Sequence, residues 1–247
     1  MGNPAGVCVL PAAISTSEMQ AIARELNQPE TAFLLGNGSS YAVRWFSPEV
    51  EVKLCGHATL ASAQVLWSEG WAARGQEITF TSPHDRLVAK RGEDGAIWLD
   101  FPGLPGIPEA PPEDVVATID RAPIAAARHG DRWLFEFETA QDVRDIKPDF
   151  VALRKTGVRS LIVTAPSDIA PYQIISRNFA PIVGVNEDQA TGMAHICLAA
   201  HWRSRLGDEV LGWQNSKRGG VIIARSRGDR VELGGRACVE MRGEWVA

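Results

Sequence analysis

A cysteine and a histidine flank a glycine at the point where a strand-like segment meets an apolar, helix-like segment. These residues are Cys55, Gly56 and His57, and the apolar segment continues from Ala58. A helix N-terminus offers unpaired backbone N–H groups and a positive dipole end, so it can bind a carboxylate or lower the pKa of a thiol. Glycine lets the backbone approach a ligand closely. The pattern indicates a binding or thiol site, although spacing alone favours a buried structural cysteine beside a helix-capping histidine.

Hydrolase, metal and nucleotide chemistry are not indicated by the remaining motifs. Residues two apart at a turn, such as Cys55 and His57, rarely face each other, and no orienting third group is evident. His195 and His201 are six residues apart, so they do not share a helix face at ligand spacing. The glycine pairs at 219–220 and 234–235 are isolated and lack the spacing of a phosphate-binding loop. We therefore expect no metal and no cofactor.

An internal repeat relates the two halves of the chain through a shift of 133 residues. The matching pairs are Arg44 and Arg177, Phe46 and Phe179, Pro48 and Pro181, Ala61 and Ala194, and Thr31-Ala32 and Thr164-Ala165. The residues of the turn that follows the repeated segment differ between the two copies: Cys55 of the first copy aligns with Asp188 of the second. Two half-sites that face one substrate would show this pattern, in which the repeated segments are similar and the polar residues at the turns differ.

Two carboxylates are further candidates. Asp188 precedes Thr191-Gly192 at the start of the second helix-like segment, where an isolated aspartate is commonly a helix cap. Only the repeat gives it more weight, because the two helix starts then become a facing pair. Glu30 lies between Pro29 and a strand-like segment at residues 31–35, and spacing alone would make it a solvated surface residue.

The secondary-structure pattern must place these residues at the ends of strands and helices. A capping box at residues 15–18 predicts a helix that ends near residues 27–29. Residues 58–67 are apolar nearly all round, which predicts an enclosed helix, and residues 193–206 are its counterpart. Strands are expected at residues 7–10, 31–35, 41–46, 78–81, 87–90, 97–101, 133–137, 161–163, 172–178, 219–225, 230–233 and 237–246, with a further helix at 149–155.

The fold class follows from a pattern that occurs twice in the chain, in which strands surround one buried helix. Five prolines between residues 102 and 112 block both helix and ladder and predict a linker. We predict an α+β fold of two similar domains, each a curled mixed β-sheet wrapped around a central α-helix. The domains are expected at residues 1–104 and 105–247, with the final strands able to cross back to the first domain.

Composition narrows the class of protein. The 247 residues are 45% hydrophobic and 22% charged, which is ordinary for a globular chain. The net charge of −5 and the lack of Lys/Arg clusters argue against nucleic acid or an anionic membrane as the main partner. The four cysteines show no paired spacing, no signal peptide is recognisable, and no apolar run approaches the roughly 20 residues of a membrane span. We expect a cytoplasmic protein.

With these residues in view, the chain resembles the phenazine-biosynthesis PhzF-like family, whose relatives include diaminopimelate epimerase and proline racemase. The matching motifs follow the family's order along nearly the whole chain. They are Gly2-Asn3-Pro4-Ala5-Gly6-Val7, the Met19–Asn27 helix, Pro29-Glu30-Thr31-Ala32-Phe33, Phe46-Ser47-Pro48, Cys55-Gly56-His57-Ala58-Thr59-Leu60-Ala61, Phe179-Ala180-Pro181, Glu187-Asp188-Gln189-Ala190-Thr191-Gly192 and Gln214-Asn215-Ser216-Lys217-Arg218-Gly219-Gly220.

The resemblance implies a cofactor-independent isomerase, usually a homodimer, with its site in the cleft between the two domains. Glu30 would be the acid/base that moves a proton between carbons, and His57 and Asp188 would orient or polarise a small carboxylate substrate. The implied substrate-binding residues are Cys55, Gly56, Ala58, Thr191, Gly192 and Met193. Such chemistry needs a carboxylate whose pKa burial raises towards neutrality, and helix-start amides that stabilise the developing charge.

The chain departs from the family pattern in three ways. The family's first strand, before Gly2-Asn3-Pro4, is missing from this sequence. Met193 stands where phenazine-pathway members carry a small hydroxyl residue, and Gln189 replaces a usual proline, which argues against the phenazine substrate itself. Cys55 matches the first catalytic thiol of the epimerases and racemases, whereas Asp188 aligns with it in the second copy, which disfavours a two-thiol epimerase and leaves a mixed pair open.

Three functions therefore remain open on the sequence. The first is the isomerase that uses Glu30, His57 and Asp188. The second is an epimerase or racemase of an amino or hydroxy acid that uses Cys55. The third is a non-catalytic ligand-binding protein that kept the fold, an interpretation motivated by Met193 and the missing strand.

Overall fold

The computed structural model describes residues 1–245, and residues 246–247 lie outside the described part. The chain divides into two compact units. The N-unit comprises Pro4–Asp100 together with the chain from Gly234 onwards, and the C-unit comprises Met1–Asn3 with Phe101–Leu233. The expected domains at residues 1–104 and 105–247 stay a prediction.

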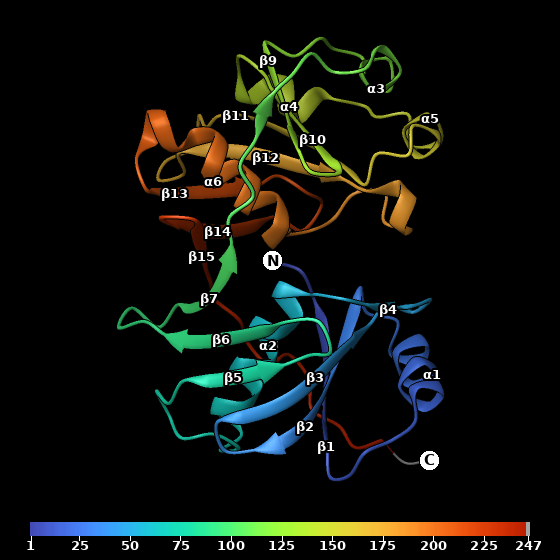
Figure 1. Cartoon of the computed structure of the whole chain (residues 1–247), viewed down its shortest axis with the longest axis vertical. Helices are drawn as coiled ribbons and strands as arrows, with labels where there is room; N and C mark the ends of the chain where they lie inside the picture. Colours follow the sequence, from blue (N-terminus) through green and yellow to red (C-terminus); the bar gives the residue numbers. More distant parts are fainter. Residues whose placement is uncertain (246–247) are drawn as a thin grey trace. The chain divides into compact units, whose positions relative to one another are not determined.

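The N-unit is a twisted mixed sheet with a central helix (Figure 1). Its elements are β1 (Ala5–Leu10), α1 (Thr16–Leu26), β2 (Glu30–Asn37), β3 (Ser40–Phe46), β4 (Glu51–Val52), α2 (Gly56–Ser68), β5 (Ile78–Thr81), β6 (Arg86–Arg91) and β7 (Ile97–Pro102). The strand order is β1-β2-β3-β5-β6-β7. The β1–β2 and β3–β5 pairs are parallel, and the β2–β3, β5–β6 and β6–β7 pairs are antiparallel.

The C-unit repeats this connectivity. Its elements are β8 (Ile107–Pro108), α3 (Glu113–Val116), β9 (Ala125–His129), β10 (Arg132–Glu136), α4 (Ala140–Asp145), α5 (Phe150–Lys155), β11 (Ser160–Pro166), β12 (Ile174–Phe179), the 3-10 helix η1 (Pro181–Val183), α6 (Gly192–Leu206), β13 (Glu209–Gln214), β14 (Gly220–Arg227) and β15 (Arg230–Gly235). The β10–β11 and β12–β13 pairs are parallel, and β11–β12 and β13–β14 are antiparallel. The prediction of curled mixed sheets, each around a central helix, is confirmed.

Alternation along β2 sends one face of the strand to α1 and the other to α2. Phe33 packs with Phe46 and with Met19 and Ala23 of α1 in one buried cluster. The capping box predicted at Ser15 is present, so α1 begins where the sequence indicates. Because successive strand residues point to opposite faces, Glu30 lies on the face opposite Phe33, where α2 begins. The helix α2 buries residues on several sides, as its apolar sequence predicts.

The internal repeat is visible in individual contacts. In each unit an arginine of the third core strand forms a two-bond ion pair with a glutamate beyond the following turn and lies over a phenylalanine ring. The ion pairs are Arg44 with Glu51, at 2.7 and 2.7 Å, and Arg177 with Glu187, at 2.7 and 3.0 Å. The guanidinium carbon lies 5.1 Å from the Phe46 ring centroid and 4.8 Å from that of Phe179.

The structure corrects the uniform shift of 133 residues. Thr31 pairs with Phe46, whereas Leu161 pairs with Phe179, so Leu161 and not Thr164 is the counterpart of Thr31. After the phenylalanine, η1 adds residues to the second copy, and the shift between Glu51 and Glu187 becomes 136. A helical insertion breaks a fixed sequence offset while leaving the strand pairing intact.

Several predicted boundaries differ from the structure. The proline-rich segment contains β8, whose Ile107 and Pro108 pair with β9. A proline is tolerated there because β8 is a terminal strand, where an N–H can be dispensed with. The last expected strand is wrong over its described part, because residues 237–245 form no strand, and residue 246 lies outside the described residues. Short elements such as β9, β13, α3 and α4 carried too weak a periodicity to be predicted.

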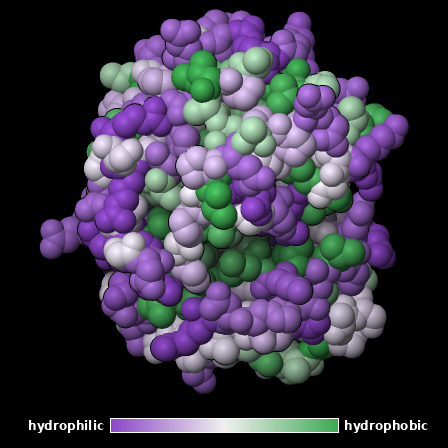
Figure 2. Space-filling view, turned by 45° about the horizontal axis from the view of Figure 1, so that its top comes forward, coloured by the Kyte–Doolittle hydropathy of each residue, from purple (hydrophilic) through white to green (hydrophobic). Residues whose placement is uncertain are grey.

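On the face drawn in Figure 2, hydrophilic residues cover most of the surface. Exposed large hydrophobic side chains of the described chain include Val50, Trp71 and Ile124 in connecting segments and Val151 in α5. Among the described residues, no helix has both the length and the apolar character needed to cross a bilayer.

Candidate active site

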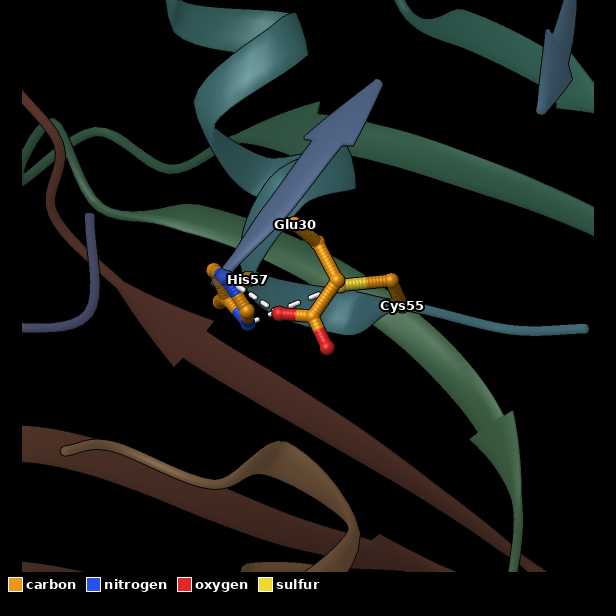
Figure 3. A group of neighbouring side chains, drawn as sticks. All are labelled: Glu30, Cys55 and His57. Atoms are coloured by element: carbon orange, nitrogen blue, oxygen red, sulfur yellow. Dashed lines mark hydrogen bonds and ion pairs between the residues drawn. The ribbon is translucent and has the colours of Figure 1, made fainter. Parts of the chain in front are cut away.

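Glu30, Cys55 and His57 form a side-chain cluster in the N-unit (Figure 3). The Oε2 atom of Glu30 lies 3.3 Å from Nε2 of His57. The Sγ atom of Cys55 lies 3.5 Å from Nδ1 of the same ring. The imidazole therefore links a carboxylate to a thiol. The Glu30 and His57 side chains are 22% and 18% exposed, so the cluster is partly shielded and still reachable from solvent.

Local structure explains why residues 25 positions apart meet. Glu30 is the first residue of β2, directly after Pro29. Cys55 is the N-cap of α2 in extended conformation, and His57 is in the first turn of the helix. The hydroxyl of Thr59 donates to the Cys55 carbonyl at 2.7 Å and fixes this start. The cluster thus lies where β2 begins and α2 begins, on one face of the sheet.

The start of α2 has the character expected of an anion-binding site. The Cys55 side chain makes no capping bond to the helix. The first amides of α2, including those of Gly56 and Ala58, point along the helix axis and place partial positive charge at this end. Ala58 itself is fully buried, so only its main chain could serve a ligand.

Asp188 is the centre of a second polar cluster, which lies in the C-unit. Its Oδ1 accepts from Nδ2 of Asn3 at 2.8 Å and from the amide of Gln189 at 2.9 Å. Its Oδ2 accepts from the hydroxyl of Thr191 at 2.5 Å. Three donors on one carboxylate fix its orientation. The carboxylate is thus held by its own turn and by Asn3 near the N-terminus of the sequence.

The start of α6 resembles that of α2. Thr191 is the N-cap, but its hydroxyl is used by Asp188 and makes no capping bond. Within the described residues, the amides of Gly192, Met193 and Ala194 have no hydrogen-bond acceptor. The half-buried Met193 presents an apolar side chain beside these amides, where a hydroxyl would have supplied a further polar contact.

The N-caps correct the sequence alignment of Cys55 with Asp188. Cys55 and Thr191 cap the two central helices, so they are structural counterparts, 136 residues apart. The next position that contacts the cap matches as well, since Thr59 binds the Cys55 carbonyl and Nδ1 of His195 binds the Thr191 carbonyl at 2.9 Å. Cys55 and Asp188 are therefore not equivalent positions, because Asp188 lies before the second helix start, and their action as a mixed pair stays a prediction.

His195 is held neutral by its surroundings. Burial lowers its pKa to about 4, and the bond to the Thr191 carbonyl opposes the shift only in part. Nδ1 carries the proton that the carbonyl accepts, and the buried Nε2 has no partner among the described residues. The ring is thus a capping donor and a core side chain.

The lowered pKa of His195 should make the free energy of unfolding fall at acidic pH. The unfolded chain binds a proton at His195 below a pKa of about 6.5, whereas the folded chain does so only near pH 4, so stability present above pH 6.5 is lost as the pH falls. The shift corresponds to a loss of about 3 kcal/mol in the free energy of unfolding. Urea titrations at several pH values should show a shallower decline for His195→Thr, which keeps the capping bond as Thr59 does. An equal decline in both proteins would contradict this assignment.

Gln214 is a site residue to which the sequence assigned no role. Its buried side chain accepts from the Thr191 amide at 2.8 Å and donates to the Asp188 carbonyl at 2.8 Å and the Thr191 hydroxyl at 3.1 Å. The same strand-to-turn segment continues the support, because the hydroxyl of Ser216 donates to the Gln189 carbonyl at 2.7 Å. A Cβ on Gly220 would lie 2.6 Å from that of Ala190, so only glycine fits there. This segment is the base on which residues 188–191 rest.

Replacing Gln214 by alanine should destabilise the C-unit. The substitution leaves the Thr191 amide and the Asp188 carbonyl unpaired in a partly buried place, and each unpaired group costs about 1–3 kcal/mol. We expect chemical denaturation to show a loss of roughly 2–4 kcal/mol. The exposed Gln141 provides the control, since its replacement by alanine should change stability by less than about 0.5 kcal/mol. Equal effects of the two substitutions would refute the supporting role.

The structure thus brings the predicted residues together in two groups. Glu30, Cys55 and His57 meet in the N-unit, with Gly56 and Ala58 in the same helix start. Asp188, Thr191, Gly192 and Met193 are close together in the C-unit. A single cleft that joins the two groups stays a prediction. Asn3 and Gln214 were missed as site residues, although both belong to motifs that carry the family resemblance.

The matches to known proteins cover nearly the whole chain. Residues 1–243 match the family described as "Phenazine biosynthesis-like protein" (PhzC-PhzF). A protein of Halalkalibacterium halodurans named an uncharacterized isomerase is 42% identical over 246 residues, which are 98% of this chain and 92% of that protein. The crystal structure of a PhzF-family protein from Enterococcus faecalis superposes with a TM-score of 0.92 at 36% identity, covering 100% of this chain and 94% of that one.

A more distant structure supports the fold alone. A predicted epimerase from Pseudomonas aeruginosa superposes with a TM-score of 0.71 at 22% identity, covering 100% of this chain and 94% of that chain. The fold is therefore shared with a protein described as an epimerase, while the sequence is close to the PhzF group.

Proposed function

Because the chain belongs to the phenazine biosynthesis-like (PhzF) family, we propose that it is an isomerase that shifts a proton between two carbons of a small carboxylate. The observation that supports this most directly is the contact of the Glu30 carboxylate with the His57 ring, 3.3 Å away, at a partly shielded helix start. Relatives that cover almost the whole chain carry the name of isomerase, without a named substrate.

In the proposed reaction, Glu30 is the acid/base. Its carboxylate takes a proton from an sp3 carbon of the substrate, and the electron pair of that C–H bond enters the conjugated system of the substrate. The protonated Glu30 then returns a proton to another carbon of the same system. Bonds, protons and electrons balance within one molecule, so no oxidant or second substrate is required. A general acid/base of this kind contributes roughly 10²–10⁴ in rate.

In the proposed reaction, His57 and the helix N-termini would orient the charged groups and stabilise the negative charge of the substrate. His57 lies beside Glu30 and can orient the carboxylate or polarise the substrate. The amides at the start of α2 or α6 can bind the substrate carboxylate, because helix N-termini favour negative charge. Asp188, fixed by its three donors, would orient a donor group of the substrate. No further side chain is needed for this scheme.

A thiol-dependent epimerase is the second candidate. The 3.5 Å contact of Cys55 with His57 favours it, since an imidazole can take the thiol proton. The counterpart of Cys55 is the hydroxyl-bearing Thr191, so a symmetrical pair of thiols is missing from the two helix starts. This alternative would therefore use Cys55 as its single base. Asp188 lies near Thr191 in the sequence and is not the counterpart of Cys55.

A ligand-binding protein without catalysis is the third candidate. Met193 replaces a polar contact at the start of α6, and the amides beside it could still hold a carboxylate. This alternative predicts saturable binding of small carboxylates without any exchange of their carbon-bound hydrogens.

Deuterium uptake from heavy water separates these functions. A panel of small carboxylic acids, including a dihydroaromatic acid and several amino acids, is incubated with chelator-treated protein and followed by NMR. Uptake that disappears on Glu30→Gln supports the isomerase. Uptake that survives Glu30→Gln and disappears on Cys55→Ser supports the epimerase. Binding without uptake, seen by ligand-observed NMR in the same samples, supports the third candidate and contradicts the proposal.

A further inference from the structure

The N-unit cluster offers three donor types that divalent metals bind. A carboxylate oxygen of Glu30, Sγ of Cys55 and a ring nitrogen of His57 all lie within 4.8 Å of one another. Zn²⁺ takes thiolate, imidazole and carboxylate ligands, and sites with three protein ligands keep a fourth position open. The sequence expectation of no metal rested on histidine spacing and did not include Glu30, which joins the other two only through the fold.

The separations are close to those that a tetrahedral ion requires. With Zn–S of about 2.3 Å and Zn–N or Zn–O of about 2.0–2.2 Å, tetrahedral ligands lie about 3.4–3.6 Å apart. Sγ of Cys55 is already 3.5 Å from Nδ1 of His57. Oε2 of Glu30 is 3.3 Å from Nε2, the other ring nitrogen, so the side chains must shift before all three donors can face one ion. Figure 3 shows the three side chains converging from β2 and the start of α2.

We propose that Glu30, Cys55 and His57 form a three-ligand site for Zn²⁺ and that the bound ion blocks proton transfer at the same residues. The blocking clause rests on the proposed function, whereas the metal site does not. On binding, the Cys55 thiol loses its proton to solvent and a Zn–S bond forms, while Glu30 and His57 donate lone pairs. A carboxylate that shares a lone pair with the metal is a much weaker base towards a carbon-bound proton. Bound metal should therefore suppress the isomerisation.

The remaining cysteines are poor competitors for the ion. Burial raises the pKa of Cys8 to about 11 and that of Cys197 to about 12, so both thiols stay protonated near neutral pH. Cys238 is exposed and donates to Glu240 at 3.4 Å, and this hydrogen bond raises its pKa. Cys238 is the exposed thiol among the described cysteines, and it supplies the control.

Co²⁺ titration of chelator-treated protein tests the site. A thiolate–Co²⁺ charge-transfer absorption should appear, saturate at one ion per chain and disappear when Zn²⁺ is added. Cys55→Ser should abolish the absorption, and Glu30→Gln should weaken Co²⁺ binding at least tenfold. Cys238→Ser should leave both unchanged. Serine is a good N-cap residue, so Cys55→Ser should fold, which circular dichroism verifies.

The outcomes separate the metal site from the proposed function. No saturable absorption, or one that vanishes with Cys238→Ser and survives Cys55→Ser, overturns the metal site. Metal-free protein that catalyses deuterium uptake, and that stoichiometric Zn²⁺ inhibits, supports the whole proposal. Uptake that continues unchanged with the site saturated overturns the blocking clause alone. Metal binding by a protein that catalyses no uptake retains the site and removes the proposed isomerase.

Discussion

Glu30→Gln is expected to lower the rate of deuterium uptake by roughly 10²–10⁴, because the amide cannot accept a carbon-bound proton. The variant should keep its structure. Its amide oxygen can still accept a hydrogen bond from Nε2 of His57, which lies 3.3 Å from Oε2 in the parent protein. Substrate affinity, measured by ligand-observed NMR, should change little. The combination of bound substrate and lost exchange is what a missing base would produce.

Glu25→Gln is the matched control for this experiment. It makes the same chemical change five residues earlier, on the exposed side of α1. Uptake should remain at the parent rate, which excludes an effect of net charge. If Glu30→Gln keeps more than a tenth of the parent rate while Cys55→Ser loses it, the base is the thiol and the isomerase mechanism is wrong.

Local sequence signals predicted the elements that carry the site. The capping box at Ser15 located α1, and the apolar run after Gly56 located the enclosed helix α2. Both signals involve residues that are close in sequence, so they can be recognised without knowledge of the fold. They place Cys55 and His57 at a helix start, but no local pattern shows which other side chains approach them.

The approach of Glu30 to His57 depends on strand pairing. Glu30 begins β2, and its direction is set by the alternation that buries Phe33 against α1. From spacing alone it is an ordinary surface glutamate; only the resemblance selected it. The link between Asn3 and Asp188 is still less accessible, because 185 residues separate the two. Polar contacts of this kind have no periodicity from which they could be predicted.

The repeat was predicted correctly in outline and wrongly in its offset. Identical residues at Arg44 and Arg177 reflect the same ion pair and ring contact in each copy. The extra turn η1 then displaces everything after it by three positions, which made Asp188 look like the partner of Cys55. Structural equivalence is decided by the helix N-caps, and these identify Thr191.

Asp188→Asn is expected to lower deuterium uptake by about 10²-fold, because the carboxylate charge orients the substrate in the proposed mechanism. Asparagine has nearly the same shape, and its oxygen can replace Oδ1, which accepts from Asn3 and Gln189. Its NH₂ group then faces Thr191, whose hydroxyl can rotate to accept. Stability should therefore fall by no more than about 1 kcal/mol.

Comparison with Gln214→Ala distinguishes an effect of the Asp188 charge from an effect of loosening the segment at residues 188–191. Gln214→Ala loosens the same segment through the Thr191 amide and the Asp188 carbonyl, so it should reduce stability and uptake together. Asp188→Asn should reduce uptake while the denaturation midpoint hardly changes. The exposed Asp114, changed to asparagine, should alter neither quantity. Should Asp188→Asn retain full uptake, the carboxylate acts only as an anchor for Asn3 and the start of α6, and proton transfer then needs Glu30 and the N-unit residues alone.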